Sequence, residues 1–223
     1  MDEPEFMSLV LLANSRKHAD RCIAGKSIED GRWVRPISAR PEASVSRSER
    51  CYEGGIEPAL LDIVEVALLE PQATALQPEN WLLDPEWYWT HQGRYAAAKL
   101  AALVDRPETL WDLGFSSKVG EHDRIPEGRT RLGSSLALIR ASDLEIWVSQ
   151  YQSEDIIGKV KVRGRFRYRQ VTYDLTITDP EIEKQYRGGP GSRARVGDRF
   201  LTISVGEPYL GYMYKLIAAV FET

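Results

Sequence analysis

The segment from Lys159 to Arg169 carries a cation at every second position, and this alternation constrains the local fold more than any other feature of the chain. Successive side chains of a β-strand point to opposite faces, whereas a helix would spread the same charges around its circumference. We therefore predict a β-ribbon with one basic face and one buried face. The basic face would carry Lys159, Lys161, Arg163, Arg165, Arg167 and Arg169, and the buried face Val160, Val162, Phe166 and Tyr168.

A row of cations along an extended strand suits the phosphates of a nucleic acid, and we expect a single strand as the ligand. The net charge of −4 does not oppose this, because residues 159–173 hold six cations and no acid while residues 60–86 hold only acids. The alternative is an ordinary solvated strand whose basic side chains prevent pairing with other chains. We favour the binding surface, because edge protection needs only about one or two lysines.

Three further positions are candidates for the same ligand. Tyr173, just beyond the ribbon, could stack on a base, or it could be a half-buried strand tyrosine. Trp33 and Arg35 share one strand face and could form a base-binding platform, although the usual burial of tryptophan favours a core role, with Arg35 paired to a loop carboxylate. Lys17, near Asn14 and Lys26, could contribute to a small anion pocket.

Two distant segments of the chain share one sequence pattern, and the stretch between them differs in composition. Residues 62–71 and 198–208 each begin with an aspartate, continue as an apolar strand and end at Glu-Pro, and each follows a hairpin and a Gly-containing loop. Between them, the alanine-rich residues 94–104 predict a helix. We therefore predict an α+β, mainly β protein. Its parts would be a first β-unit at residues 6–75, a helical insert and loop at residues 76–133, and a second β-unit at residues 134–223.

Several short motifs of the chain together resemble the dual OB-containing family, whose members occur in prokaryotic conflict and defence gene contexts. The motifs are residues 14–17 (NSRK), 21–25 (RCIAG), 33–38 (WVRPIS), 61–64 (LDIV), 77–80 (QPEN), 110–111 with Gly114, 135–136 (SL) and 214–219 (YKLIAA). The resemblance implies two OB-like barrels and a nucleic-acid ligand, and it supplies no catalytic residue. Gly164 agrees with barrel geometry, because a glycine inside a strand often marks a sharp bend.

The segment before the predicted helix is rich in tryptophan and acidic residues. Trp81, Trp87 and Trp89 could form a patch that binds a protein partner, which would make the chain an interaction adaptor. The alternative is that these indoles pack the insert onto the barrels.

We predict no catalytic activity, no cofactor and no metal site. The three histidines are isolated, and Cys22 and Cys51 lack the paired spacing of a zinc site. A third hypothesis is a metal-dependent nuclease or nucleotide-processing enzyme. It rests only on scattered acids such as Glu121, Asp123 and Asp143.

The location of the chain is predicted from the same sequence. No apolar run approaches the roughly 20 residues of a membrane span, and the acidic residues 1–6 differ from a signal peptide. We expect a cytoplasmic protein without membrane contact.

Overall fold

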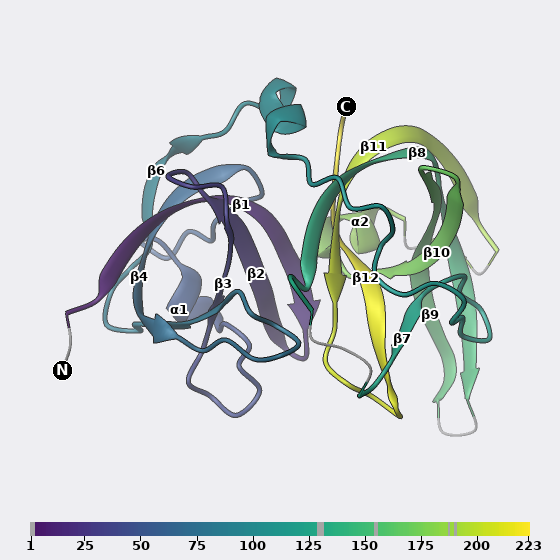
Figure 1. Cartoon of the computed structure of the whole chain (residues 1–223), viewed down its shortest axis with the longest axis horizontal. Coiled ribbons are helices and arrows are strands. Elements are labelled where there is room, and N and C mark those ends of the chain that lie inside the picture. Colours follow the sequence, from purple (N-terminus) through teal and green to yellow (C-terminus); the bar gives the residue numbers. More distant parts are fainter. Residues whose placement is uncertain (1–2, 129–131, 154–155, 187, 190) are drawn as a thin grey trace. The chain divides into compact units, whose positions relative to one another are not determined.

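The computed structural model describes residues 3–128, 132–153, 156–186, 188–189 and 191–223. In the hairpin that contains the ribbon, it describes side chains only up to Gln150 and again from Val160. The chain divides into two compact units, the first formed by residues 1–103 and 130–135 and the second by residues 104–129 and 136–223 (Figure 1). Each unit contains its own ring of strands and its own hydrophobic core.

The first ring has five strands in the order β1-β2-β3-β5-β4, and it closes because β4 also pairs with β1. β3 and β5 run parallel, and the other neighbouring pairs of the ring run antiparallel. A sixth strand, β6, extends the sheet beside β4, and the short helix α1 lies between β3 and β4 in the chain. The bounds are β1 Glu5–Lys17, β2 Asp20–Ser27, β3 Trp33–Ile37, α1 Arg47–Arg50, β4 Asp62–Pro71, β5 Asn80–Leu83 and β6 Thr90–Arg94.

The second ring repeats this order as β8-β9-β10-β12-β11, with β11 returning to β8. Its parallel pair, β10 with β12, occupies the place of β3 with β5, and the short helix α2 again follows the third strand. A short strand, β7, pairs with β12. The bounds are β7 Arg124–Pro126, β8 Leu136–Ser153, β9 Ile156–Tyr168, β10 Val171–Ile177, α2 Pro180–Gln185, β11 Arg193–Val205 and β12 Tyr212–Phe221.

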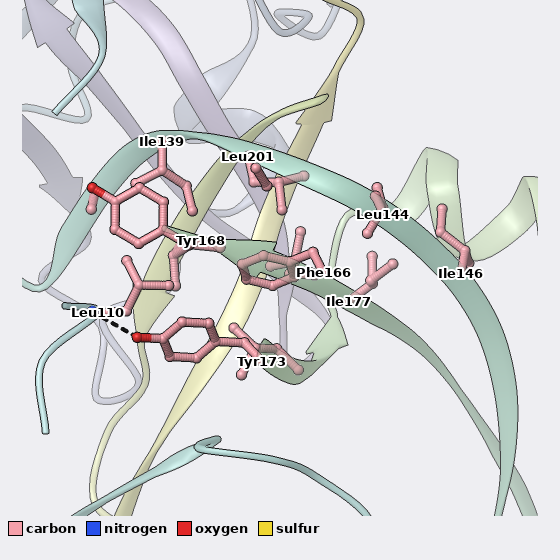
Figure 2. Close-up of a cluster of buried hydrophobic side chains, with 14 of the residues drawn as sticks. Leu110, Ile139, Leu144, Ile146, Phe166, Tyr168, Tyr173, Ile177 and Leu201 are labelled. Atoms are coloured by element: carbon pink, nitrogen blue, oxygen red, sulfur yellow. Dashed lines mark hydrogen bonds between the residues drawn. The ribbon is translucent and has the colours of Figure 1, made fainter. Parts of the chain in front are cut away.

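The equal strand order confirms the prediction of a mainly β protein with two OB-like barrels. The predicted echo between residues 62–71 and 198–208 falls on the fourth strand of each ring, β4 and β11. In the second core the rings of Phe166 and Tyr173 stack at 5.6 Å between their centroids (Figure 2). A Cβ at Gly164 would lie 2.6 Å from Cδ1 of Ile217, so the glycine makes room for a core side chain.

The stretch predicted as a helical insert, residues 76–133, differs from the expectation. It contributes β5 and β6 to the first unit and β7 to the second, and its longest helix among the described residues is the 3-10 helix η1, Ala97–Leu103. The alanine-rich sequence is too short to sustain an α-helix by propensity alone. Its last carbonyl, that of Leu103, instead accepts a hydrogen bond of 2.7 Å from Lys26 Nζ. Across the described residues, the helices all fall short of the length and apolar content needed to cross a bilayer.

Candidate nucleic-acid interface

The predicted alternation of β9 is present over its second half. Arg165 and Arg167 are exposed, whereas Phe166 and Tyr168 are buried in the second core. Lys161 is half-buried on the basic face. Val160 is more exposed than predicted, and the side chain of Lys159 lies outside the described residues. Arg169 lies beyond the end of β9, in the turn to β10, where its Nη2 donates to the carbonyl of Arg106 at 3.0 Å. Arg169 is therefore exposed but does not continue the strand row.

Arg163 corrects the prediction most strongly, because only 2% of this residue is exposed. Its Nε donates to Asp174 Oδ1 at 2.7 Å, its Nη2 to the Asp174 carbonyl at 2.6 Å and its Nη1 to Thr176 Oγ1 at 3.0 Å. Burial raises the pKa of the Asp174 carboxyl, while the charge of Arg163 opposes that rise. A buried guanidinium needs a paired anion and filled hydrogen bonds, so Arg163 is a structural residue rather than an exposed phosphate contact.

The segment that precedes β7 covers Arg163. Glu121 and Asp174 exchange backbone hydrogen bonds of 3.2 and 3.0 Å, which fixes this segment along β10. Asp123 Oδ2 lies 3.8 Å from Arg163 Nη2, and its carboxylate accepts bonds from the backbone and hydroxyl of Ser117. A Cβ at Gly120 would lie 1.9 Å from Asp123 Oδ2, so only glycine permits this close approach.

The exposed arginines have carboxylate partners at the surface. Arg165 Nη2 lies 2.8 Å from Glu121 Oε2, and Arg167 Nε lies 3.7 Å from Asp143 Oδ2. Arg193 on β11 lies 3.4 Å from Glu145. Exposed ion pairs of this kind contribute only about 0–1 kcal/mol, so the phosphates of a ligand could replace these carboxylates. The basic face is thus partly neutralised, which the sequence pattern did not indicate.

A half-buried indole, that of Trp147 on β8, lies on the same face of the barrel as these arginines and was missed from the sequence. The strand register places Trp147 between Arg163 on β9 and Arg193 on β11. Their guanidinium carbons lie 5.8 and 5.5 Å from the ring centroid, and Trp147 Nε1 donates to Asp174 Oδ2 at 3.0 Å. We call the surface formed by Trp147, Lys161, Arg165, Arg167, Arg193 and Arg195 the Trp147 face.

The predicted stacking residue Tyr173 is fully buried, and the structure corrects that expectation. Its ring packs on Phe166, and its hydroxyl oxygen accepts a hydrogen bond of 3.2 Å from the backbone of Leu110 (Figure 2). Burial also raises the pKa of the Tyr173 hydroxyl. Tyr173 is therefore a core residue, buried more deeply than the half-buried strand tyrosine that was the alternative.

The predicted platform of Trp33 and Arg35 is also replaced by a buried arrangement. Arg35 Nη2 lies 3.2 Å from Glu79 Oε1 and donates to Ser135 Oγ at 2.8 Å, and Ser135 Oγ donates to the same carboxylate. The alternative that Arg35 pairs with a loop carboxylate is therefore correct. Trp33 is half-buried, with Lys26 Nζ 5.3 Å from its ring centroid.

The small anion pocket suggested for Lys17, Asn14 and Lys26 is not formed as expected. Lys26 is buried and donates to the backbone of Leu103, so it does not face a ligand. Lys17 is half-buried at the end of β1.

The three tryptophans of the predicted partner patch do not form one surface. Trp89 is fully buried in the first core, and Trp81 is half-buried with Arg32 Cζ 5.3 Å from its ring centroid. Trp87 alone of the three is exposed.

A buried lysine of the second unit, Lys215, makes the free energy of unfolding depend on pH in the alkaline range. Burial lowers the pKa of Lys215 from 10.5 to about 8, and Asp112 and Asp123 only partly oppose this effect. The unfolded chain keeps the proton up to higher pH than the folded chain, so stability is gained as pH rises from about 8 to 10.5. Compared with Lys215→Met, the wild type should gain about 3 kcal/mol in free energy of unfolding over this window, measured by urea titration. A constant difference between the two proteins would contradict the prediction.

Comparison with protein families matches residues 7–220 to the family described as dual OB-containing domain. Comparison with curated proteins and with solved structures gives no match. OB barrels commonly bind oligonucleotides or oligosaccharides on one strand face and the adjoining loops. Because the match extends over nearly the whole sequence, the chain belongs to the family of dual OB-containing domains.

Proposed function

We propose that the protein binds single-stranded nucleic acid along the Trp147 face without catalysing a reaction. One observation carries the proposal: Arg193 lies beside the half-buried Trp147 indole, and the exposed Arg165 and Arg167 lie on the same face of the adjacent strand of an OB-like barrel. Cationic grooves with aromatic platforms are the common means by which OB folds hold single strands.

The chemistry of the face suits a single strand better than a duplex. The arginines would bind phosphates and release condensed counterions, while the Trp147 indole would contact an unstacked base. In a duplex the bases are already stacked on one another, so the indole would add little. The phosphates would replace the surface carboxylates as ion-pair partners of the arginines. These carboxylates are those of Glu121, Asp143 and Glu145. A role in prokaryotic defence and a cytoplasmic location stay predictions from the sequence.

The proposal is tested with fluorescein-labelled DNA and RNA strands of about 20 nucleotides and with the matching duplex, by fluorescence anisotropy at several salt concentrations. We expect tighter binding of the single strands. The logarithm of the association constant should fall with the logarithm of salt with a slope near −2, as expected for about three phosphate contacts. Binding that ignores salt, or a preference for duplex, would overturn the proposal.

Trp147→Leu tests the contribution of the indole. Loss of one stacked base should weaken single-strand binding by about 1–3 kcal/mol, or roughly 5- to 150-fold. The matched control is Trp87→Leu, which removes an exposed indole from the first unit and should leave binding unchanged.

Glu121→Gln should have the opposite effect and tighten binding of a single strand by about 2- to 5-fold. The substitution keeps the shape of the side chain but removes the anion that lies 2.8 Å from Arg165. The same anisotropy titration measures the change, with the exposed Glu53→Gln of the first unit as the control. Equal affinity of Glu121→Gln and wild type would mean that Arg165 does not reach the ligand.

A further inference from the structure

The first unit has an exposed aromatic surface that nucleic-acid binding does not use. Phe6 on β1 is 47% exposed and Trp87 is 51% exposed, and their rings meet edge to face at 5.2 Å between centroids. The exposed Leu69 lies on the same sheet face, because Phe6 pairs with Ala67 and Leu69 is two residues further along β4. We call Phe6, Leu69 and Trp87 the Trp87 patch.

The loop that carries Trp87 is fixed at both ends. The Asp84 backbone donates to the carbonyl of Ala67 at 3.0 Å, and its carboxylate accepts a bond of 3.0 Å from the backbone of Glu86. Trp89, two residues after Trp87, is anchored in the first core. An indole held outward on an anchored loop is typical of a binding hot spot, because little entropy is lost when a partner covers it.

The surroundings of the Trp87 patch define the charge of its partner. Acidic side chains adjoin the patch: the exposed Glu86 precedes Trp87 in its loop, and the half-buried Glu65 lies on the same face of β4 as Leu69. Residues 62–86 contain no lysine or arginine at all. Arg32, with its Nη2 3.9 Å from Glu5, is the cation recorded at this edge among the described residues. A complementary partner is therefore cationic and offers an apolar or aromatic group.

We propose that the Trp87 patch binds the Trp147 face of a second copy of this chain. That face has the required chemistry, since it carries the exposed Arg165, Arg167, Arg193 and Arg195 together with a half-buried indole. An arginine of one copy can stack on the Trp87 indole of the other while the acids of the patch pair with the neighbouring cations. The contact is heterologous, so it joins copies head to tail.

The proposed contact is weak and competes with nucleic acid. An anchor of three apolar side chains is smaller than a standard protein interface, so we expect association only in the range of about 10–500 µM. A strand bound to the Trp147 face would displace the second copy. The contact itself does not require that nucleic acid is the ligand of that face.

Sedimentation velocity of the purified full chain tests the proposal between about 5 and 500 µM at low salt. The average mass should rise with concentration, and both salt and excess single-stranded oligonucleotide should reverse the rise. A monomer at every concentration would overturn the proposal. Association without any oligonucleotide binding would remove the proposed function but leave this inference standing.

Two charge-reversed proteins give a sharper test. Glu65→Lys with Glu86→Lys alters only the acids around the Trp87 patch, and Arg165→Glu with Arg195→Glu alters only the Trp147 face. Each protein alone should remain monomeric, because one of its two surfaces no longer attracts the other. Their mixture should associate, because each contributes one native surface and the two reversed surfaces are again opposite in charge. A mixture that stays monomeric would contradict the proposal.

Trp87→Ser tests the apolar anchor and separates it from nucleic-acid binding. It should raise the apparent dissociation constant for self-association at least about tenfold and leave oligonucleotide binding unchanged. Leu210→Ser, which removes an exposed apolar side chain from a turn of the second unit, is the matched control and should change neither. Self-association that persists in Trp87→Ser would show that the patch is not the contact.

Discussion

Exchanging both Arg165 and Arg167 for glutamate should weaken binding of a single-stranded oligonucleotide by at least about 100-fold. Both side chains are exposed on β9 and, two residues apart in a strand, they point the same way at a separation of about 7 Å. The exchange removes two phosphate contacts and places two anions, beside Glu121 and Asp143, where phosphates would lie. Like charges brought together cost several kcal/mol, which is a larger effect than the loss of contacts alone.

The control must change the net charge equally without touching the Trp147 face. Arg47→Glu with Lys99→Glu does so at two exposed positions of the first unit. Fluorescence anisotropy at low salt compares the two double variants with the wild type, and thermal unfolding verifies that all three are folded. Equal losses of affinity in both variants would reduce the effect to net charge and would remove β9 from the interface.

The part of the fold that could be predicted is the part that strand periodicity determines. The assignment of Phe166 and Tyr168 to the core and of Arg165 and Arg167 to the surface follows from the period of two alone. The repeat was also visible, because residues 62–71 and 198–208 are equivalent strands of two rings. These features are local, so no knowledge of distant contacts was needed.

The burial of Arg163 could not be predicted in the same way. Alternation tells which face of a strand a residue belongs to, but not what covers that face. Asp123, about 40 residues earlier in the chain, lies beside Arg163 only because its segment pairs with β10 through Glu121. Packing against distant parts of the chain also explains why Trp89 is buried while Trp87 is exposed. Only Trp89 of these two indoles belongs to the first core.

The outward position of Trp147 could have been predicted from the sequence, whereas its neighbouring side chains could not. Residues 144–148 alternate between buried and partly exposed positions, which places Trp147 outward by the argument used for β9. Its two arginine neighbours depend on the pairing of β8 with both β9 and β11. The row of cations in β9 therefore indicates half of the Trp147 face, but not the aromatic residue that suggests how a base is held.

Replacing Asp174 by alanine should lower the free energy of unfolding by about 3–5 kcal/mol. The substitution leaves the guanidinium of Arg163 buried without its main anion, because Asp123 Oδ2 is 3.8 Å away. It also removes the acceptor of the Trp147 Nε1 hydrogen bond. Urea unfolding followed by circular dichroism measures the loss, and indole fluorescence should report a changed environment of Trp147.

Two comparisons assign that loss to the uncompensated charge. Asp143→Ala removes an exposed carboxylate 3.7 Å from Arg167 and should change stability by no more than about 0.5 kcal/mol. Arg163→Met combined with Asp174→Leu replaces the buried pair by apolar side chains and should recover most of the stability lost in Asp174→Ala. If the double variant is no more stable than Asp174→Ala, hydrogen bonding through Thr176 and Trp147, rather than the unpaired charge, is the cause of the loss. Recovery in the double variant would instead mean that the Arg163 pair serves the placement of Trp147 more than the stability of the barrel.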